Sequence, residues 1–565
     1  MKSIFLSRAN VSRGFSIFSI LAFAASQTNA QQTAPSPQPN IVYILTDDLG
    51  YGDIDGLNPG NKIKTPQFKT PQIDQLAADG MTFTEAHSSS AVCTPSRYSI
   101  LTGRYNWRST LKKGVLGGLS RPLIEEGRLT VAELLRSRGY QTAAIGKWHL
   151  GLGWARLPDA RGNSNEGSDT DEASSNLIRN AGAGVDFTKP ISDGPTTHGF
   201  DYFFGISASL DMSPYTFIEN DRVTAQPTIQ KGTVYGADGK HYRIGPQASG
   251  FKAEDVLPIL TQHATDYIDQ RAADARNGKL FFLYLALPSP HTPIAPTIKW
   301  QGKSGLNYYA DYVMETDDYI GKVLAALDRD RLTTNTLVVF ASDNGCSPEA
   351  DFPYLLSHDH DPSAGRRGYK ADIYDGGHRV PMIVRWPGHI APGTQTSDFT
   401  CLDDFIATCT DIFGVKLPDN AAEDSISFLP VILGRTGPPP RDTLVESSIN
   451  GSFGIRKGQW KLAFCPDSGG WSYPRPGRDN TDSWPRFQLF DAVADPEEKT
   501  NVYGQHQEIV NRLGRLIRDY IINGRSTPGV AQTNDSVKAW QQTQWLDQFK
   551  STNLVTGVIP ADQPQ

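Results

Sequence analysis

Residues 40–53 read Asn40-Ile-Val-Tyr-Ile-Leu-Thr-Asp-Asp-Leu-Gly-Tyr-Gly-Asp53. The segment from Ile41 to Leu45 is apolar or aromatic at every position, as in a parallel strand that other elements cover on both faces. It is followed by two adjacent carboxylates, Asp47 and Asp48. We therefore predict a buried strand that carries polar side chains at its carboxyl end.

The same pattern recurs along the chain. Further apolar runs lead into polar groups at residues 142–149, 280–291 and 337–345, and residues 308–327 keep helical spacing between two of them. Strands that alternate with helices predict an α/β fold with a large central, mostly parallel sheet flanked by helices. Ligands bind beyond the carboxyl ends of such strands, so the candidate site residues are expected to gather there.

A second unit follows residue 434. The proline run at residues 438–440 marks the change, residues 452–464 and 488–491 suggest antiparallel strands, and residues 509–520 form one helical face that ends before Gly524. We predict an α/β catalytic domain at 40–435, a smaller C-terminal domain of antiparallel sheet plus helix at 445–525, and a tail at 526–565. Residues 162–173 are too polar to pack, and residues 212–250 suggest irregular or hairpin structure.

The N-terminus has the features of an export signal. Lys2, Arg8 and Arg13 precede an apolar run at residues 15–25, and a small-residue cleavage site follows at 28–30. We predict a signal peptide at 1–30 and a linker at 31–39, hence an exported protein that is periplasmic or secreted. The apolar run is too short for a stable membrane anchor, although a retained anchor is the alternative. The net charge of -7 argues against a nucleic-acid partner.

Five cysteines occur, and the number is odd. Cys401 and Cys409 lie in a stretch that suggests a helix, where eight residues rise about 12 Å, too far for a disulfide. The pairing of the other cysteines stays open. The absence of a Cys-x-x-Cys motif argues against a thiolate zinc site.

Two polar pairs at strand ends suggest a metal site. Asp47 with Asp48, and Asp343 with Asn344, offer three carboxylates and one amide. Such an oxygen-only set suits a hard divalent cation, Ca2+ or Mg2+. The alternative for each pair alone is capping of the following loop or helix.

Several side chains are candidates for handling an anionic group. Lys147 and His149 lie on one side of an extended segment, and His291 sits among prolines that limit its freedom, which suits a general acid. Lys370 lies in a segment dense in charge and glycine, and Ser209 in a serine-rich loop. The alternatives are a solvated edge strand, a structural histidine, a tight turn and a locally bonded serine, respectively.

Cys93 stands in Ser88-Ser-Ser-Ala-Val-Cys-Thr-Pro-Ser-Arg97. It is either a buried core thiol or a nucleophile, as a thiolate beside Arg97 would be. A cysteine phosphatase needs a Cys-x5-Arg loop, whereas Arg97 is four residues on. Neither that chemistry nor a cysteine protease requires a hard-metal cluster.

Cys93-x-Pro-Ser-Arg97, followed by Leu101-Thr-Gly-Arg104, resembles the sulfatase signature. With residues 146–149 and 342–345 in the expected order, the chain from about residue 40 to 524 is similar to type I (formylglycine-dependent) sulfatases. These form the arylsulfatase family of the alkaline-phosphatase-like superfamily. The resemblance implies that fold and hydrolysis of sulfate monoesters. Export and an anionic-group pocket favour a sulfated carbohydrate as substrate.

The resemblance also implies a set of roles. A formylglycine-generating or sulfatase-maturing enzyme would oxidise Cys93 to Cα-formylglycine, whose hydrate attacks sulfur. Ca2+, with Mg2+ as the alternative, would be bound by this residue and by Asp47, Asp48, Asp343 and Asn344. Arg97 would stabilise the hydrate, and the sulfate would be held by Lys147, Ser209 and Lys370. His291, with Lys370, would protonate the leaving alcohol, and His149 would take the proton of the second hydroxyl.

Two positions depart from the family pattern. Asp375 stands where Glu is common, and His378 stands where another residue is commoner and could face the substrate. Two alternatives stay open: a phosphoester or phosphonate ester hydrolase on the same scaffold, and a sulfated-glycan-binding pseudoenzyme that never matures its cysteine.

Overall fold

The computed structural model describes residues 38–57, 67–157, 184–231, 234–235, 241–535 and 540–550. The predicted signal peptide, most of the linker, the polar segment 162–173 and the last part of the tail lie outside these residues. Among the helices of the described ranges, none combines the length and the apolar character that crossing a bilayer requires.

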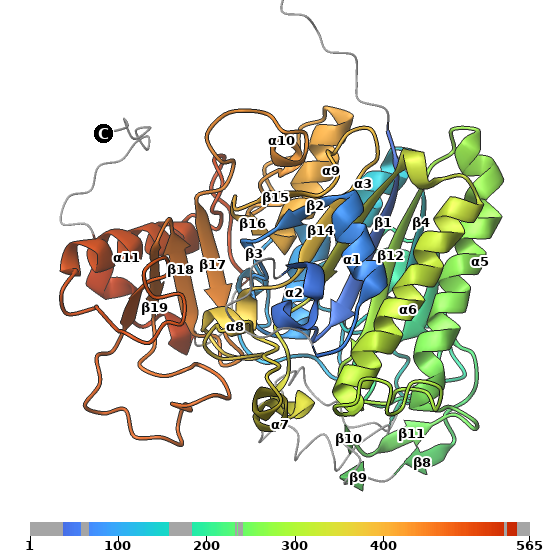
Figure 1. The fold of residues 1–565 in the computed structure, drawn as a ribbon, viewed down its shortest axis with the longest axis horizontal. Coiled ribbons are helices and arrows are strands. Elements are labelled where there is room, and N and C mark those ends of the chain that lie inside the picture. The colour runs from blue at the N-terminus through green and yellow to red at the C-terminus, as the bar shows by residue number, and fades with distance from the viewer. Residues whose placement is uncertain are drawn as a thin grey trace, which may run out of the picture. The chain divides into compact units, whose positions relative to one another are not determined.

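Strand β1 (Asn40–Asp47) lies inside a ten-stranded sheet of order β15-β2-β14-β13-β1-β12-β4-β5-β6-β7 (Figure 1). It pairs in parallel with β12 (Phe281–Pro290) on one side and β13 (Thr336–Ser342) on the other. Strands β4 (Gln141–Lys147) and β5 (Tyr202–Ile206) continue the parallel part beyond β12. The predicted parallel sheet is confirmed at its centre.

The two edges of this sheet are mixed. Strand β14 (Met382–Arg385) runs antiparallel to β13, β2 (Met81–Phe83) runs antiparallel to β14, and β15 (Thr394–Thr396) runs parallel to β2. At the other edge, β6 (Ile218–Glu219) and β7 (Arg222–Val223) are antiparallel. The sheet is therefore parallel in its buried centre and mixed at the margins.

Helices cover both faces of the sheet. Val42 and Ile44 face a core with α1 (Pro71–Asp79), α5 (Val256–Arg276) and α6 (Tyr308–Arg329). Ile41, Tyr43 and Leu45 face a second core with α2 (Cys93–Thr102), α3 (Val131–Ser137) and α9 (Phe405–Phe413). Because β1 is buried on both faces, its sequence is apolar without interruption.

A separate four-stranded antiparallel sheet follows. It consists of β17 (Thr443–Ser447), β18 (Phe453–Lys457), β19 (Trp460–Ala463) and β20 (Gln488–Asp491). Helix α11 (Gln507–Ile522) packs on it through Val510, Leu513 and Ile517, which share a core with Ile455 and Leu462. The predicted sheet plus helix is confirmed.

The small sheet contacts the segment that leads to Cys93. Ser447, the last residue of β17, donates its backbone N–H to Ser89 (3.0 Å) and accepts from Ala91 (3.0 Å). The loop before the signature cysteine is therefore held by the small sheet.

Shorter elements complete the described chain. Segment 212–250 contains β8 (Ile229–Lys231) paired with β11 (Gly245–Gln247), and β9 (Val234–Tyr235) paired with β10 (His241–Tyr242), in agreement with the expected hairpins. Other short α-helices and strands are α7 (Phe352–Ser357), α8 (Asp375–His378), α10 (Leu429–Ile432), β3 (Ala86–His87) and β16 (Thr400–Cys401).

The prediction that Cys401 and Cys409 share a helix is wrong. Cys401 ends strand β16, which pairs with β3, and only Cys409 lies in α9. All five cysteines lie in the described ranges, where they are buried and free of disulfides.

Candidate active site

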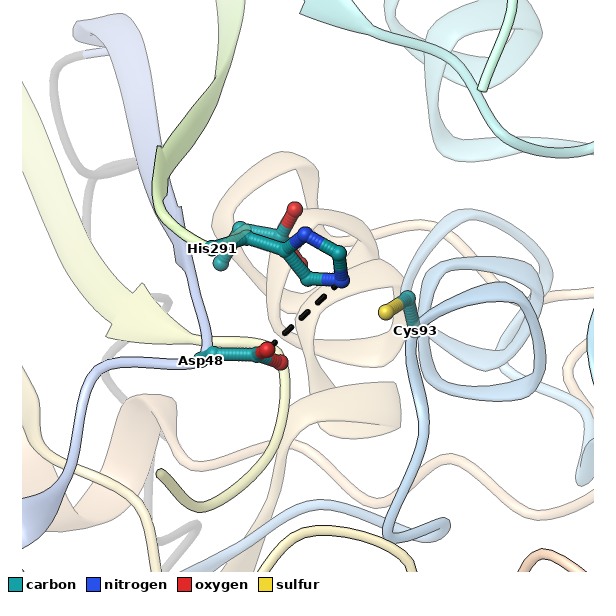
Figure 2. A group of neighbouring side chains, drawn as sticks. Asp48, Cys93 and His291 are labelled. Carbon is teal, nitrogen blue, oxygen red and sulfur yellow. Dashed lines mark ion pairs between the residues drawn. The ribbon is translucent and has the colours of Figure 1, made fainter. Parts of the chain in front are cut away.

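The predicted site residues converge at the carboxyl edge of the sheet. Asp47 ends β1 and Asp48 follows it, and Asp343 and Asn344 follow β13. Lys147 ends β4, and His291 follows β12. Cys93, the first residue of α2, faces Asp48 and His291 (Figure 2). All of these side chains are buried.

Glycines allow the strands beneath the site to approach closely. A Cβ on Gly146 would lie 1.9 Å from the carbonyl oxygen of Ala286, and one on Gly205 would lie 1.8 Å from that of Gly146. Gly146 also has a φ of +123°, which side chains disfavour. The glycine just before Lys147 is thus needed for the path of β4 into the site.

Arg97 ties helix α2 to three strand ends. Its Nε donates to Asp343 Oδ2 (2.9 Å), its Nη1 donates to the carbonyl of Lys147 (3.1 Å), and its Nη2 lies 3.5 Å from Asp47 Oδ1. Burial acts against the charge of Arg97, but Asp343 and Asp47 outweigh it and raise the pKa of the guanidinium. Arg97 therefore stays charged and fixes the geometry around Cys93, one helical turn away.

Two lysines pair with the adjacent aspartates. Lys147 Nζ lies 2.6 Å from Asp47 Oδ2, and Lys370 Nζ lies 2.7 Å from Asp48 Oδ2. Burial acts to raise the pKa of Asp47, but Lys147, His291 and Arg97 outweigh it and hold that pKa well below its usual range. Buried ion pairs of this kind add little to stability, so their concentration here indicates a functional role.

The site gathers several side chains that could hold a metal ion. Ligand atoms of Asp47, Asp48, Cys93 and His291 all lie within 4.8 Å of one another. Within the described residues, Asp47 Oδ1 and Asn344 Oδ1 are buried and form no hydrogen bond. Because buried polar atoms are nearly always satisfied, these oxygens fit a cation of the Ca2+ or Mg2+ type.

Asp343 takes part in the same cluster through its hydrogen bonds. Its Oδ1 accepts from the backbone N–H of Asp48 (3.3 Å), while Oδ2 accepts from Arg97. Burial and the charge of Asp47 raise the pKa of Asp343 to about 6. A bound cation would oppose this shift, since positive charge favours the carboxylate.

The two histidines present different nitrogens to the site. His149 Nε2 lies 2.7 Å from the carbonyl of Leu116, which assigns the proton to Nε2, and the buried Nδ1 forms no hydrogen bond among the described residues. Burial, with Lys147 and Arg97, holds the pKa of His149 well below its usual range, so the ring is neutral. His291 is bonded through Nδ1 to the carbonyl of Thr292 (2.5 Å), and its Nε2 lies 3.6 Å from Asp48 Oδ2.

Cys93 is a poor thiolate. Burial raises its pKa to about 12, although Lys147 and Lys370 act in the opposite direction. The group at this position is therefore a thiol at neutral pH. Its Sγ marks where an oxygen of residue 93 would stand after oxidation of the side chain.

Ser209 lies beside the same segments. Its neighbour Ala208 packs with Val92 and Ala371, which flank Cys93 and Lys370 in sequence. Its own hydroxyl is buried without a hydrogen-bond partner among the described residues. That hydroxyl is free to bind a ligand.

Known proteins resemble this chain in sequence and in fold. The profile of the sulfatase family matches residues 39–415, well over half of the 565 residues. The chain belongs to the sulfatase family. It is accordingly an enzyme, a hydrolase of sulfuric esters.

Individual relatives agree with this identification. The sulfatase is 33% identical over 519 residues to an N-acetylgalactosamine-6-O-sulfatase of Bacteroides thetaiotaomicron, covering 85% of this chain and 93% of the relative. It is 32% identical over 481 residues to human arylsulfatase A, covering 82% and 83%. A solved structure from work on glycosaminoglycan metabolism by Bacteroides thetaiotaomicron matches with a TM-score of 0.71 and 31% identity, over 86% of this chain and 99% of that one.

The two departures from the family pattern lie next to the sulfatase site. Asp375 begins α8 and pairs with Arg366 (3.2 Å) and Arg379 (3.3 Å). His378 ends α8, and its Nδ1 lies 3.0 Å from the carbonyl of Ser88. Burial lowers the pKa of His378 to about 4, so this ring is a neutral support of the segment before Cys93.

Residues that support Asp48 were missed in the sequence. The Tyr309 hydroxyl lies 3.3 Å from the carbonyl of Asp48 and donates to Asp53, which His360 contacts at 2.8 Å. Asp48 itself has a φ of +64°, an uncommon conformation for a residue with a side chain. The partners lie 256 and 307 positions from Asp53, so no local pattern could have revealed them.

Proposed function

We propose that this sulfatase is exported and removes sulfate from a carbohydrate, through residue 93 as a formylglycine hydrate and a bound divalent cation. The observation that carries the proposal is the position of Cys93 at the start of α2, within 4.8 Å of ligand atoms of Asp47, Asp48 and His291. The 33% identity to an N-acetylgalactosamine-6-O-sulfatase favours a sulfated amino sugar.

Asp47, Asp48, Asp343 and Asn344, with residue 93, would hold the cation, which we take to be Ca2+, with Mg2+ as the alternative. When bound, such an ion offsets the negative charge of the sulfate ester and favours ionisation of the attacking hydroxyl. The charges of the protein support this assignment. Three carboxylates (Asp47, Asp48, Asp343) face three cationic side chains (Arg97, Lys147, Lys370), so these charges balance. A divalent cation would add two positive charges and leave a net attraction for an anionic ester.

Residue 93, as a hydrated aldehyde, would supply one hydroxyl as nucleophile and a second whose deprotonation releases sulfate. Lys147, Lys370 and Ser209 would bind the sulfate oxygens, and Arg97 would orient residue 93. A sulfate ester resists attack because its own oxygens repel nucleophiles, and fixed positive charge at the site lowers this barrier.

The two histidines divide the proton transfers. His291 Nε2 faces Cys93 and Asp48, so it would give a proton to the oxygen of the departing alcohol, with Lys370 beside the same carboxylate. His149 is neutral and its Nδ1 forms no hydrogen bond within the described part of the chain, so it would accept the proton of the second hydroxyl. An acid and a base with different environments are typical of such sites.

The maturation step has a direct test. The sulfatase is produced with and without a formylglycine-generating or sulfatase-maturing enzyme, and the peptide that spans Cys93 is examined by mass spectrometry. We expect the mass of an aldehyde, together with sulfate release, only in the co-produced sample. Active protein that carries only the unmodified thiol would contradict the proposed chemistry.

The substrate class is tested with two sets of substrates. One is a panel of sulfated oligosaccharides. The other compares an aryl sulfate with the phosphate monoester and the phosphonate ester of the same aryl alcohol. We expect kcat/KM to be highest for sulfate esters of sugars. Faster turnover of the phosphonate or phosphate ester would instead support the alternative hydrolase on the same scaffold.

A further inference from the structure

The loop between β19 and β20, residues 464–487, exposes aromatic side chains. Trp471 is 39% exposed, Tyr473 is 65% exposed and Trp484 is 39% exposed. Within the described residues, the exposed tryptophans are Trp471 and Trp484. The rings of Tyr473 and Trp484 meet edge to face with centroids 6.3 Å apart. Exposed aromatic clusters of this kind are characteristic of binding surfaces.

This loop is anchored beside the active site. Asp372 lies two residues beyond Lys370, so their Cα atoms are at most about 8 Å apart. Asp372 Oδ1 accepts the backbone N–H groups of Trp471 (2.7 Å) and Ser472 (3.0 Å). A Cβ on Gly470 would lie 2.4 Å from the carbonyl oxygen of Ala371, so the loop packs directly against the segment that carries Lys370.

The loop carries charges of both signs, three arginines and three aspartates. Arg475, Arg478 and Arg486 are exposed, and Asp479 is partly buried where it accepts from the backbone and the Nε of Arg475 (2.7 and 3.2 Å). Asp482 is exposed as well, so the loop carries no net positive charge, and its arginines can meet an anionic group only locally.

We propose that Trp471, Tyr473 and Trp484 form a platform that binds the part of an anionic glycan beyond the sulfated sugar. Sugar rings have apolar C–H faces that can lie on aromatic rings, while the exposed Arg486 of the same loop can pair with a carboxylate or sulfate group of a neighbouring unit. The inference rests on the proposed carbohydrate substrate and adds that the enzyme prefers oligosaccharides to monosaccharides. Figure 1 shows the loop as the long orange segment that extends below β18 and β19.

The test measures dependence on chain length. Sulfate release is compared between 6-sulfated N-acetylgalactosamine and glycosaminoglycan oligosaccharides of four and six sugars that end in the same unit. For the wild type we expect a higher kcat/KM on the longer substrates. Trp471→Ala or Trp484→Ala should each lower the ratio of hexasaccharide to monosaccharide kcat/KM by about five- to tenfold, with Trp471→Phe retaining most of it. Val493→Ala serves as the control. It truncates a side chain that is 71% exposed and lies just after β20, and it should leave the ratio unchanged.

Affinity gives a second measurement. In a Cys93→Ala background, calorimetry with the hexasaccharide should show weaker binding when Trp471 or Trp484 is changed to Ala. The platform would be overturned if both tryptophan variants kept the wild-type ratio of kcat/KM values and the wild-type affinity for the hexasaccharide. It would also be overturned if the only effect of the substitutions were a loss of self-association of the protein. If the wild type hydrolyses an aryl sulfate but no sulfated sugar, the proposed substrate class fails first, and the platform fails with it.

Discussion

At the scale of single residues, the site combines neutral and charged groups whose roles differ by environment. His149 is held neutral by burial and by Lys147, while His291, which is also buried, faces Asp48. Asp47 Oδ1 and Asn344 Oδ1 are left without hydrogen bonds among the described residues. These features lead to one prediction about proton transfer and one about the cation.

His291→Ala should slow the enzyme by a factor that depends on the leaving group of the substrate. On a sugar sulfate, whose alcohol needs a proton as it departs, we expect kcat to fall about 10²- to 10⁴-fold. On 4-nitrophenyl sulfate, whose phenolate departs readily, the fall should be much smaller. His358→Ala, at an exposed position after α7, serves as the control and should change neither substrate's kcat. Equal losses on both substrates would argue against a general-acid role.

Asp47→Asn should remove the response to Ca2+. In the wild type, Ca2+ at 100 times its Kd should raise the free energy of unfolding by about 2.7 kcal/mol, and chelation should reverse this and abolish sulfate release. The variant should show no Ca2+-dependent shift in thermal unfolding, because one ligand charge is lost. Asp411→Asn, an exposed acid in α9, should keep the full shift. A shift retained in Asp47→Asn would place the cation elsewhere.

At the scale of elements, helix α2 is fixed at both ends. Cys93 and Arg97 meet the strand ends at its N-terminus, and its C-terminus stops at Gly103, which has a φ of +65°. A Cβ on Gly103 would lie 2.4 Å from Ile406 Cγ2 and 2.7 Å from Ala422 Cβ. The glycine of the Leu-Thr-Gly-Arg motif is therefore a packing requirement that positions Cys93 indirectly.

Gly103→Ala should destabilise the fold by about 2–5 kcal/mol, the sum of backbone strain and overpacking. The matched control is Gly250→Ala, where φ is +80° but a Cβ would meet nothing within 4 Å. That change should cost only the strain, about 1 kcal/mol. Denaturant unfolding of both variants measures the difference, and equal losses would contradict the packing argument.

A second element-scale prediction concerns the junction of the two sheets. Glu85 pairs with Arg379 (2.8 Å) and with Arg456 of β18 (3.1 Å). Burial acts to raise its pKa, but the hydrogen bond from His87 and the two arginines outweigh it and lower the pKa from 4.5 to about 2. Because the folded pKa is lowered, the stabilisation is present above pH 4.5 and is lost as the pH falls to 2.

Glu85→Gln should therefore destabilise the protein by roughly 1–3 kcal/mol at pH 7, an amount reduced by partial solvent exposure. The difference from wild type should shrink steadily below pH 4.5 and disappear near pH 2. Urea unfolding across this range measures it. Glu508→Gln, whose side chain is 72% exposed, should show no comparable pH dependence. A constant difference at all pH values would show that the charge of Glu85 is not what stabilises the junction.

At the scale of the whole molecule, the features that could be predicted from the sequence are those that depend on residues close together in the chain. Strands β1, β4, β12 and β13 are buried on both faces, so their apolar runs could be recognised, and their polar ends marked the site. The antiparallel direction of β14 could not be predicted, because pairing depends on partners far away in the chain. The same holds for Arg97 with Asp343, 246 positions apart, and for Lys370 with Asp48, 322 positions apart. The signature indicated the residues, and only the fold supplied their partners.

The burial of the signature by the whole fold also limits when the proposed conversion of Cys93 could take place. Cys93, Thr94, Ser96 and Arg97 are at most 2% exposed, and the loop before them is hydrogen-bonded to the small sheet. Such residues become accessible only when much of the structure opens. Purified, folded, unconverted protein should thus keep its thiol when incubated with the maturing enzyme, whereas a synthetic peptide of residues 88–104 should gain the aldehyde under the same conditions. Mass spectrometry distinguishes the two, and equally fast conversion of the folded protein would show that the loop opens locally in the native state.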